Sequence, residues 1–333
     1  MLGAGADPRK TRTPRQDPKH RLWQAARVAL DVRRLLILRA VLRAGSLTAA
    51  ARELGWTQPA VSQHLRHLER EAGVPLLLRG PAGVSPTEAG FVLLARADAV
   101  AAELHAAEEE VSALAGLRAG RVRLQAFPSA AATLVPAAVG ALAEAHPGIA
   151  VGLEEAEPDT ALPAVLAGDA DLALAFGYDG PPSDLSGLAW RPLLVEPVLL
   201  VLPPGTSAPP GLAALREEPW IGGCVRCRGH LVDACRTAGF DPHLRHTTDD
   251  YVVVQNLVAR GLGVTALPAS ALAAHRHPDV VAVPLAELGL RHVGLALRPG
   301  AEAVPATAAL VAELERVARH TAPAHTLTSE AAD

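Results

Sequence analysis

Three cysteines and a histidine lie within twelve residues, in the segment CVRCRGHLVDAC at positions 224–235. Thiolate sulfur and imidazole nitrogen are ligands that zinc prefers in proteins. Cys224 and Cys227 have a Cys-x-x-Cys spacing, and His230 and Cys235 follow. A helix is predicted at about 229–238, and in it His230 and Cys235 would lie on different faces. This arrangement disfavours one metal ion bound by all four side chains, and we expect no metal.

The same cysteines could instead react as thiols. Cys224 and Cys227 lie near the start of the predicted helix, beside Arg226 and Arg228. A helix N-terminus and neighbouring cations both lower the pKa of a thiol, which makes it reactive towards oxidants. In a third interpretation, the cysteines are structural and are buried at a strand–helix junction. At this stage oxidant sensing, metal binding and a structural role all stay open.

A second group of polar side chains follows a tight turn at residues 55–57. Thr57 can cap a helix there, and Pro59 falls in its first turn, where a missing N–H costs little. Val61, Leu65 and Leu68 recur at i, i+4 and i+7 and should face inward. The side chains left near the start and outer side can reach base edges and phosphates in a DNA groove. These residues are Gln58, Ala60, Ser62, Gln63, Arg66 and His67.

The elements that must position these side chains are two short helices and their neighbours. Ser46 can cap the first helix, and Gly55 lies where that helix must end. Upstream, Asp31 opens a further helix with an apolar face. Downstream, residues 73–79 form a strand-like run, residues 80–83 are typical of a turn, and Val84 can begin a second strand. The sequence therefore predicts a helix-turn-helix with a third helix and a two-stranded wing.

At this point the chain resembles the LysR-type transcriptional regulators, a large bacterial family. The resemblance rests on GSLTAAAREL at 45–54, TQPAVS at 57–62 with Leu68 and Glu69, GVPL at 73–76 and TEAG at 87–90. Trp56 departs from the family pattern, as does Leu-Leu-Arg at 77–79 in place of Phe-x-Arg. The resemblance implies a DNA-binding surface made by Ser46, Thr48, Thr57, Gln58, Pro59, Ala60, Ser62, Gln63, Arg66, His67 and Arg79.

The resemblance also implies partners. Apolar residues recur every seven positions between 87 and 118, which favours a long helix that packs against other helices. In the family this linker helix pairs two DNA-binding domains, and the pairs usually assemble into tetramers. A two-fold dimer implies a roughly palindromic operator with half-sites about one turn apart. RNA polymerase is a further partner if the regulator is an activator. We expect no cofactor and no enzymatic activity, because the chain has no GxGxxG, P-loop or HExxH motif.

Charge is distributed unevenly along the 333 residues. Residues 1–100 hold 16 Lys and Arg against 8 Asp and Glu, and the remaining residues hold 15 against 27. A basic end on an acidic body suits binding of nucleic acid by that end. The sequence shows no uninterrupted apolar run of spanning length and no signal peptide, and its cysteine content fits a reducing compartment. We therefore expect a cytoplasmic protein with no membrane partner.

Beyond residue 120, predicted strands alternate with predicted helices, which favours a parallel α/β sheet. The resemblance implies two lobes like those of periplasmic binding proteins. The expected fold is α/β overall, with an N-terminal winged helix-turn-helix. We divide the chain into a disordered basic extension at 1–28, a DNA-binding domain at 29–86, a linker helix at 87–118, an effector domain at 121–320 and a disordered tail at 321–333. Lobe I comprises about 121–200 and 284–320, and lobe II about 201–283.

An effector should bind where strands of the two lobes end near helix N-termini. Ser129 follows the first strand and could bind a carboxylate there or simply cap a helix. Glu157 is either an exposed surface acid or, in the cleft, a group that would attract a cationic ligand or disfavour an anionic one. The residues expected to line this cleft are Phe127, Ser129, Ala130, Glu157, Phe176, Cys224, Thr248, Asp250, Thr265 and Pro268. The rival interpretation is a solute-binding or interaction protein that uses the same lobes without binding DNA.

Overall fold

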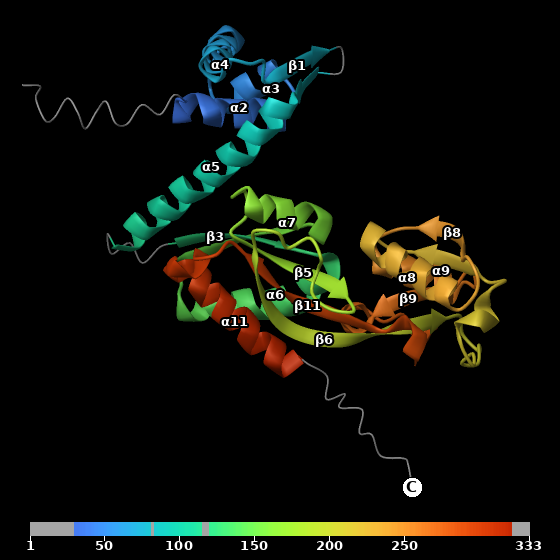
Figure 1. Ribbon diagram of the computed structural model, residues 1–333. Helices are drawn as coiled ribbons and strands as arrows, with labels where there is room; N and C mark the ends of the chain where they lie inside the picture. Colours follow the sequence, from blue (N-terminus) through green and yellow to red (C-terminus); the bar gives the residue numbers. More distant parts are fainter. Residues whose placement is uncertain (1–29, 81–82, 115–119, 322–333) are drawn as a thin grey trace, which may run out of the picture. The chain divides into compact units, whose positions relative to one another are not determined.

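A computed structural model describes residues 30–80, 83–114 and 120–321 (Figure 1). The chain divides into two compact units, residues 1–97 and 98–333. The predicted N-terminal extension, all but the first residue of the predicted tail and the end of the predicted linker helix lie outside the described residues. We describe each unit by itself.

Three helices form the body of the first unit. Helix α2 (Val32–Ala44) is capped by the Asp31 carboxylate, which accepts from the amides of Arg33 and Arg34. Helix α3 (Leu47–Glu53) is capped by Ser46, whose hydroxyl accepts from the amide of Ala49 at 3.1 Å. Helix α4 (Gln58–Ala72) follows after a turn that contains Gly55 in the left-handed region. The predicted start of each helix is confirmed.

The core of this unit is made by the apolar faces of the three helices. Val61, Leu65 and Leu68 of α4 are fully buried and pack with Leu38 and Val41 of α2. Burying several aliphatic side chains of this size stabilises the unit by about 2 kcal/mol each. The inward face predicted from the spacing in α4 is confirmed. The predicted capping hydrogen bond of Thr57 at the start of α4 is absent.

Thr57 occupies the N-cap position of α4, but its side chain makes no capping hydrogen bond. The side chain is exposed, so water can solvate the first amides of the helix. A two-stranded wing follows α4, with β1 (Leu77–Gly80) antiparallel to β2 (Gly83–Pro86). The amide of Val84 donates to the carbonyl of Gly45 at 2.9 Å, which ties the wing to the end of α2.

Helix α5 (Glu88–Leu114) is the long helix expected after the wing. Its hydroxyl-containing neighbour Thr87 accepts a hydrogen bond from the amide of Gly90 at 3.0 Å. Four large apolar side chains on α5 are exposed: Phe91, Val92, Leu104 and Val111. Exposed apolar residues along one long helix favour a helical partner.

The second unit is built on a mixed sheet. Strands β3 (Gly120–Ala126), β4 (Ile149–Glu155) and β5 (Leu172–Tyr178) are parallel to one another. Strand β11 (Leu290–Leu297) lies between β5 and β6 (Ala189–Leu202) and is antiparallel to both. The parallel sheet predicted from strand–helix alternation is confirmed for β3, β4 and β5, and β11 makes the sheet mixed because it returns from the far lobe.

Helices cover this sheet and close the first lobe (Figure 1). They are α6 (Pro128–Ala145), α7 (Pro158–Leu166) and α11 (Pro305–Thr321). Helices α6 and α11 pack on each other, and α7 packs on β5. The core between them includes Leu134, Leu142, Leu174 and Leu310. Within the described residues, α6 is the one helix whose length and apolar composition would suffice to cross a membrane. Its packing on α11 is that of a core helix.

The second lobe surrounds the far half of β6. There β6 pairs with β9 (Thr265–Pro268) and β10 (Val281–Pro284). The other elements are β7 (Pro219–Gly222), α8 (Val225–Thr237), β8 (His243–Thr247), α9 (Tyr251–Ala259) and α10 (Ala269–Ala274). The sequence pattern predicts neither the strand β8 nor the helix α10. Strand β8 has a polar composition, and α10 has only six residues, so neither shows a strong periodic pattern.

Candidate DNA interface and effector cleft

The outer face of α4 is the first candidate site. Gln58, Gln63 and Arg66 are exposed, and His67 is half-buried. A hollow of about 990 Å³ lies beside this face, and four of the predicted DNA-binding residues line it. Desolvation and then the positive charge of Arg70 lower the pKa of His67. The lining residues are Pro59, Gln63, Arg66, His67, Glu69, Arg70, Gly73, Val74 and Pro75.

Other predicted DNA-binding residues lie around this helix. Thr48, Thr57 and Arg79 are exposed, while Ser46 is half-buried because its hydroxyl caps α3. The expectation that Ser62 lies on the outer side is wrong, because only 7% of it is exposed. It adjoins Val61 and lies on the buried side of α4. Ala60 is half-buried.

The second candidate site is a cavity of about 50 Å³ between the two lobes. Eight of the ten residues predicted for the effector cleft line it: Phe127, Ser129, Glu157, Phe176, Cys224, Thr248, Thr265 and Pro268. Of the other two, Ala130 lines a separate cavity, and Asp250 caps α9, its carboxylate accepting from the amides of Val252 and Val253. The structure therefore brings together side chains from strand ends that are more than 100 residues apart.

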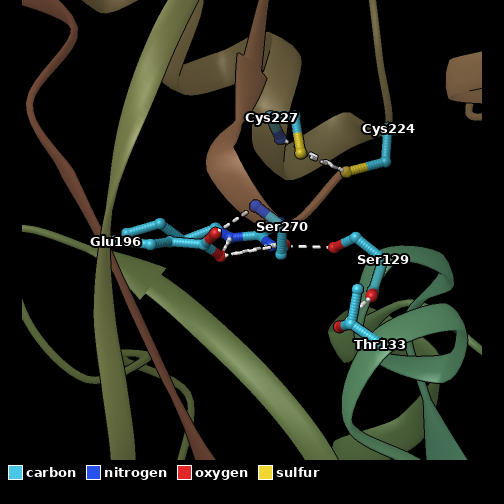
Figure 2. Close-up of polar contacts among 7 residues, drawn as sticks. Ser129, Thr133, Glu196, Cys224, Cys227 and Ser270 are labelled. Carbon is cyan, nitrogen blue, oxygen red and sulfur yellow. Dashed lines mark hydrogen bonds and ion pairs between the residues drawn. The ribbon is translucent and has the colours of Figure 1, made fainter. Parts of the chain in front are cut away.

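A buried arginine lies at the wall of this cavity. Arg291 and Glu196 are each 2% exposed, and Arg291 Nη2 lies 2.6 Å from Glu196 Oε1. The same nitrogen donates to the hydroxyls of Ser129 at 2.8 Å and Ser270 at 2.9 Å. Figure 2 shows Ser129, Ser270 and Glu196 gathered at this point. Desolvation opposes the guanidinium charge, but the negative charge of Glu196 keeps the pKa of Arg291 above its ordinary value.

Two aromatic rings complete this wall. The guanidinium carbon of Arg291 lies 4.9 Å from the ring centre of Phe127 and 4.7 Å from that of Phe176. The two rings meet edge to face, with their centroids 4.8 Å apart. Cation–π contacts are strongest where water is excluded, as it is here. Arg291 is thereby held in one orientation, with its hydrogen bond to Ser129 directed toward the cleft.

Two thiols at the start of α8 contact each other in the lining of the cavity (Figure 2). Cys224 Sγ and Cys227 Sγ are 2.9 Å apart, and both cysteines are free. The hydrogen bond from Cys224, followed by the positive charge of Arg291, lowers the pKa of Cys227. The same contact raises the pKa of Cys224, with burial adding to the effect. Cys227 is therefore the thiol of the pair that ionises first.

The four potential metal ligands of the sequence segment do not converge. Cys235 is fully buried in the core of the second lobe. The His230 ring stacks on Tyr178 at 3.7 Å, and its Nε2 pairs with the carbonyl of Leu288 at 2.8 Å. Among the residues that the structure describes, no cluster of three or more His, Cys, Asp and Glu could hold a metal ion.

Glu157 is an acidic group on the first-lobe side of the cavity. Its Oε2 atom is buried and has no hydrogen-bond partner among the described residues. Desolvation raises the pKa of Glu157, a hydrogen bond with Cys224 opposes the effect, and the nearby negative charge of Asp249 adds to it. A ligand that donates a hydrogen bond or carries positive charge would satisfy this carboxylate.

Polar and ring contacts join α8 to the first lobe. Arg226 Nη2 lies 2.5 Å from an oxygen of Asp159 and 2.9 Å from an oxygen of Asp184. Tyr178 of β5 stacks on His230 of α8 with an interplanar angle of 2°. These contacts join elements of different lobes and hold the cleft narrow.

Sequence reasoning missed several residues of this site, above all Arg291 and Glu196. Each is a single charge inside an otherwise apolar strand segment. Opposite charges in two apolar strands signal a buried pair, because an isolated charge there would be costly. Tyr251 and Asp249, which also line the cavity, show no comparable signal.

Two protein-family models together match most of the chain. Residues 32–91 match the bacterial regulatory helix-turn-helix protein of the lysR family, and residues 115–319 match the LysR substrate binding domain. A regulator named IlvR from Caulobacter vibrioides is 30% identical over 284 residues, which cover 78% of this chain and 91% of that protein. A probable hydrogen peroxide-inducible genes activator from Streptomyces viridosporus is 33% identical, covering 67% and 72%.

Solved structures share the fold. Full-length OxyR from Pseudomonas aeruginosa, as a cysteine-to-aspartate variant, matches with a TM-score of 0.66 and 22% identity, covering 87% of this chain and 97% of that one. Full-length CbnR in complex with its target DNA matches with a TM-score of 0.56 and 23% identity, covering 86% and 100%. Identities this low show similarity of fold alone.

Proposed function

Because the chain belongs to the LysR family of DNA-binding transcriptional regulators, we propose that it reads a pseudo-palindromic operator with α4 and responds to a small molecule bound between its lobes. The helix-turn-helix and the effector-binding domain are both present, and the chain is not an enzyme. The observation that carries the proposal is the exposed polar face of α4 beside a fully buried apolar face.

The proposed base and phosphate contacts come from that exposed face. Gln58 and Gln63 can pair with base edges, and Arg66 can bind a guanine or a phosphate. Arg79 on the wing and Thr48 on α3 would bind the sugar–phosphate backbone, which fixes the orientation of the helix in the groove. His67, Pro59, Ala60, Thr57, Ser46 and Ser62 would support this surface, the last two from partly or largely buried positions.

The test is a gel shift on the upstream region of the protein's own gene at several salt concentrations. Arg66→Ala should weaken binding by about 1–3 kcal/mol if it reads a guanine, or lower the salt slope by about one if it binds phosphate. Arg276→Ala, an exposed arginine of the effector domain, is the matched control. Unchanged affinity and salt slope for Arg66→Ala would remove this residue from the interface.

The proposed assembly is a homodimer formed through α5, and a tetramer formed through the effector domains. Four exposed apolar side chains on α5 favour packing against a second helix: Phe91, Val92, Leu104 and Val111. RNA polymerase is the expected partner if the regulator activates. A location in the cytoplasm follows from binding to chromosomal DNA. Analytical ultracentrifugation of the full chain tests the assembly, and a monomer at micromolar concentration would contradict it.

The proposed effector site is the cavity between the lobes. Ser129, Phe127 and Ala130 begin α6 on one side, and Thr265 and Pro268 lie on the other. Cys224, Glu157, Phe176, Thr248 and Asp250 complete the proposed set. Binding there would shift the population of lobe arrangements, which changes how paired DNA-binding domains are spaced. The volume of about 50 Å³ suits a small ligand, or a larger one after the lobes open.

A second candidate for the signal is oxidation of the two thiols. It is favoured by the 2.9 Å contact between Cys224 Sγ and Cys227 Sγ and by the lowered pKa of Cys227. Cys227 thiolate would attack one oxygen of a hydroperoxide, forming a sulfenic acid and releasing water or an alcohol. Cys224 sulfur would then attack the sulfenic sulfur, and the sulfenic oxygen would leave as water. Two electrons pass from the thiols to the peroxide, and a disulfide of about 2.05 Å remains.

Mass spectrometry after hydrogen peroxide treatment distinguishes the two candidates. Oxidation should remove two hydrogens and link the peptides that carry Cys224 and Cys227. Cys235→Ser, which alters a buried cysteine outside the pair, should leave this change intact, whereas Cys224→Ser should stop at sulfenic or higher acids. A protein that keeps both thiols under peroxide excludes the redox candidate and leaves reversible ligand binding.

A further inference from the structure

One oxygen of the Glu157 carboxylate has no partner in the cavity between the lobes. Glu157 is the N-cap residue of α7, but its side chain makes no capping hydrogen bond and lies in the lining of the cavity. The Oε2 atom is buried and has no hydrogen-bond partner among the residues that the structure describes. An acceptor that has lost water without gaining a donor is costly. A ligand that supplies a donor at this point would remove that cost.

The positive charge in the cavity wall is already balanced. Among the described residues that line the cavity, Arg291 is the one cationic side chain. Its Nε and Nη2 atoms donate to Glu196 Oε1 at 2.9 Å and 2.6 Å, and both residues are buried. An anionic ligand would have to compete with Glu196 for this guanidinium, which disfavours anions in the cavity.

The two helices that begin at the cavity offer few amides to an anion. A helix N-terminus binds anions through its unpaired N–H groups. Helix α6 begins at Pro128 and α7 begins at Pro158, and proline has no N–H. In each helix, the amides of the third and fourth residues donate to the carbonyl of the N-cap residue, Phe127 or Glu157. At most the amide of the second residue remains, so these helix starts are weak anion sites.

Acidic groups gather around Glu157. Burial raises the pKa of Glu157, and the negative charge of Asp249, which also lines the cavity, raises it further. Cys227 lies in the same lining and ionises before its neighbouring thiol. Apart from Arg291, the ionisable side chains in the described lining are therefore all acids. A bound cation would stabilise the ionised form of each one near it.

The volume of the cavity indicates the size of the group that it admits. About 50 Å³ compares with the roughly 30 Å³ that one molecule occupies in liquid water. An ammonium group is close to water in size, and its three N–H donors can meet a carboxylate from several directions. A planar guanidinium or an aromatic cation would require the lobes to move apart. The cavity therefore fits an ammonium head-group best.

We propose that the effector of this domain carries a primary ammonium group, which binds Glu157 in the cavity between the lobes. This inference rests on the proposed function, because it names the ligand class of the effector site proposed there. The N–H groups of the ligand would satisfy Oε2 through charge-assisted hydrogen bonds. An anion of the same size would meet neither an unbalanced cation nor a set of free amides.

The test uses ethylammonium, which is protonated at pH 7, with ethanol and acetate as neutral and anionic probes of similar size. Ligand-observed NMR measures the affinity of each probe for the full-length wild-type protein, Glu157→Gln and Glu217→Gln. Glutamine keeps the size of the side chain and removes its charge. Glu217→Gln is the matched control, because Glu217 is an exposed glutamate of the second lobe that does not line the cavity.

We expect wild-type protein to bind ethylammonium at least tenfold more tightly than ethanol or acetate. Glu157→Gln should weaken ethylammonium binding about tenfold, and Glu217→Gln should leave it unchanged. Three results would each overturn the proposal: no ethylammonium binding at millimolar concentrations, acetate or ethanol binding as tightly, or equal ethylammonium affinity for wild-type protein and Glu157→Gln.

A gel shift with the same protein samples separates failure of this inference from failure of the proposed function. Operator binding by a protein that ignores ethylammonium would overturn the ligand class and leave the DNA-binding role intact. Glu157-dependent binding of ethylammonium by a protein that ignores operator DNA would support the ammonium site and contradict the DNA-binding role.

Discussion

The surroundings of each cysteine in α8 determine how readily its thiol ionises. Burial raises the pKa of Cys235 to about 11, whereas the hydrogen bond from Cys224 lowers that of Cys227. Two cysteines eight residues apart on one helix therefore differ in reactivity. Local sequence around the cysteines could not show this difference, since Arg291 and Tyr178 come from other strands.

The first prediction concerns alkylation of these thiols. Iodoacetamide should modify Cys227 with a pH midpoint below 9, the ordinary thiol value, and should leave Cys235 largely unmodified at that pH. Peptide mass spectrometry over a pH series measures both rates. In Cys224→Ser, the hydroxyl is a comparable donor, and the midpoint should stay below that of Cys224→Ala. Equal midpoints for Cys227 and Cys235 would contradict the geometry.

The second prediction concerns Glu157. Desolvation raises its pKa in the folded protein above 4.5, so the folded state holds the proton more tightly than the unfolded state does. The cost of ionisation is absent below pH 4.5, grows as pH rises towards the folded pKa and is complete above it. Glu157→Gln should therefore raise stability at pH 7 and have little effect at pH 4.

Urea unfolding at both pH values tests this prediction. Glu217→Gln, which changes an exposed glutamate of the second lobe, is the control and should be neutral at both. A loss of stability at pH 7 for Glu157→Gln would show that the carboxylate has a favourable partner when ionised.

At the level of elements, close packing around Gly90 restricts how α5 follows the wing. A Cβ at Gly90 would lie 2.1 Å from the carbonyl oxygen of Leu76 and 3.1 Å from Pro86 Cβ. The first turn of α5 therefore approaches the segment before β1 at a distance that only glycine permits. A Cβ at Gly140, in the exposed face of α6, would meet nothing within 4 Å.

The third prediction compares these two glycines. Gly90→Ala should destabilise the protein by about 1–3 kcal/mol, because the backbone must shift to admit the methyl group. Gly140→Ala should instead stabilise it by up to about 1 kcal/mol, since alanine favours the helix. Urea denaturation followed by circular dichroism measures both. A neutral Gly90→Ala would mean that α5 starts further from Leu76.

At the scale of the effector domain, ion pairs and ring stacking join the two lobes. Arg226 contacts Asp159 and Asp184 across the lobe boundary, whereas Arg236 of the same helix pairs with Asp241 within its own lobe at 2.7 Å. Arg226 is also the less exposed of the two arginines. The arrangement of the lobes thus depends on a few polar contacts in addition to the crossing strands.

The fourth prediction follows from this difference. Arg226→Ala should speed amide hydrogen exchange by a few-fold in α7 and in residues 179–188, because the lobes open more often. Arg236→Ala should affect exchange only near α8 and residue 241. Mass-spectrometric hydrogen exchange on the full chain compares them. Identical exchange patterns for the two variants would show that Arg226 does not hold the lobes together.

The amino-acid sequence by itself determined the helix-turn-helix, the wing, the long helix and the two α/β lobes. Those features depend on patterns within 10–20 residues, such as the Ser46 cap and the apolar spacing of Val61, Leu65 and Leu68. It also identified eight residues that line the cavity between the lobes, because strand ends beside helix starts can be recognised locally.

Only the tertiary structure decided the buried pair of Arg291 and Glu196 and the contacts of the two thiols with their surroundings. Arg291 and Glu196 are 95 residues apart and meet because β11 returns beside β6 in antiparallel register. Their partners are selected by strand order and by exclusion of water from the core. Strand order and solvent exclusion are not encoded in a local pattern, so the sequence marks each charge as unusual in an apolar segment but does not identify its partner.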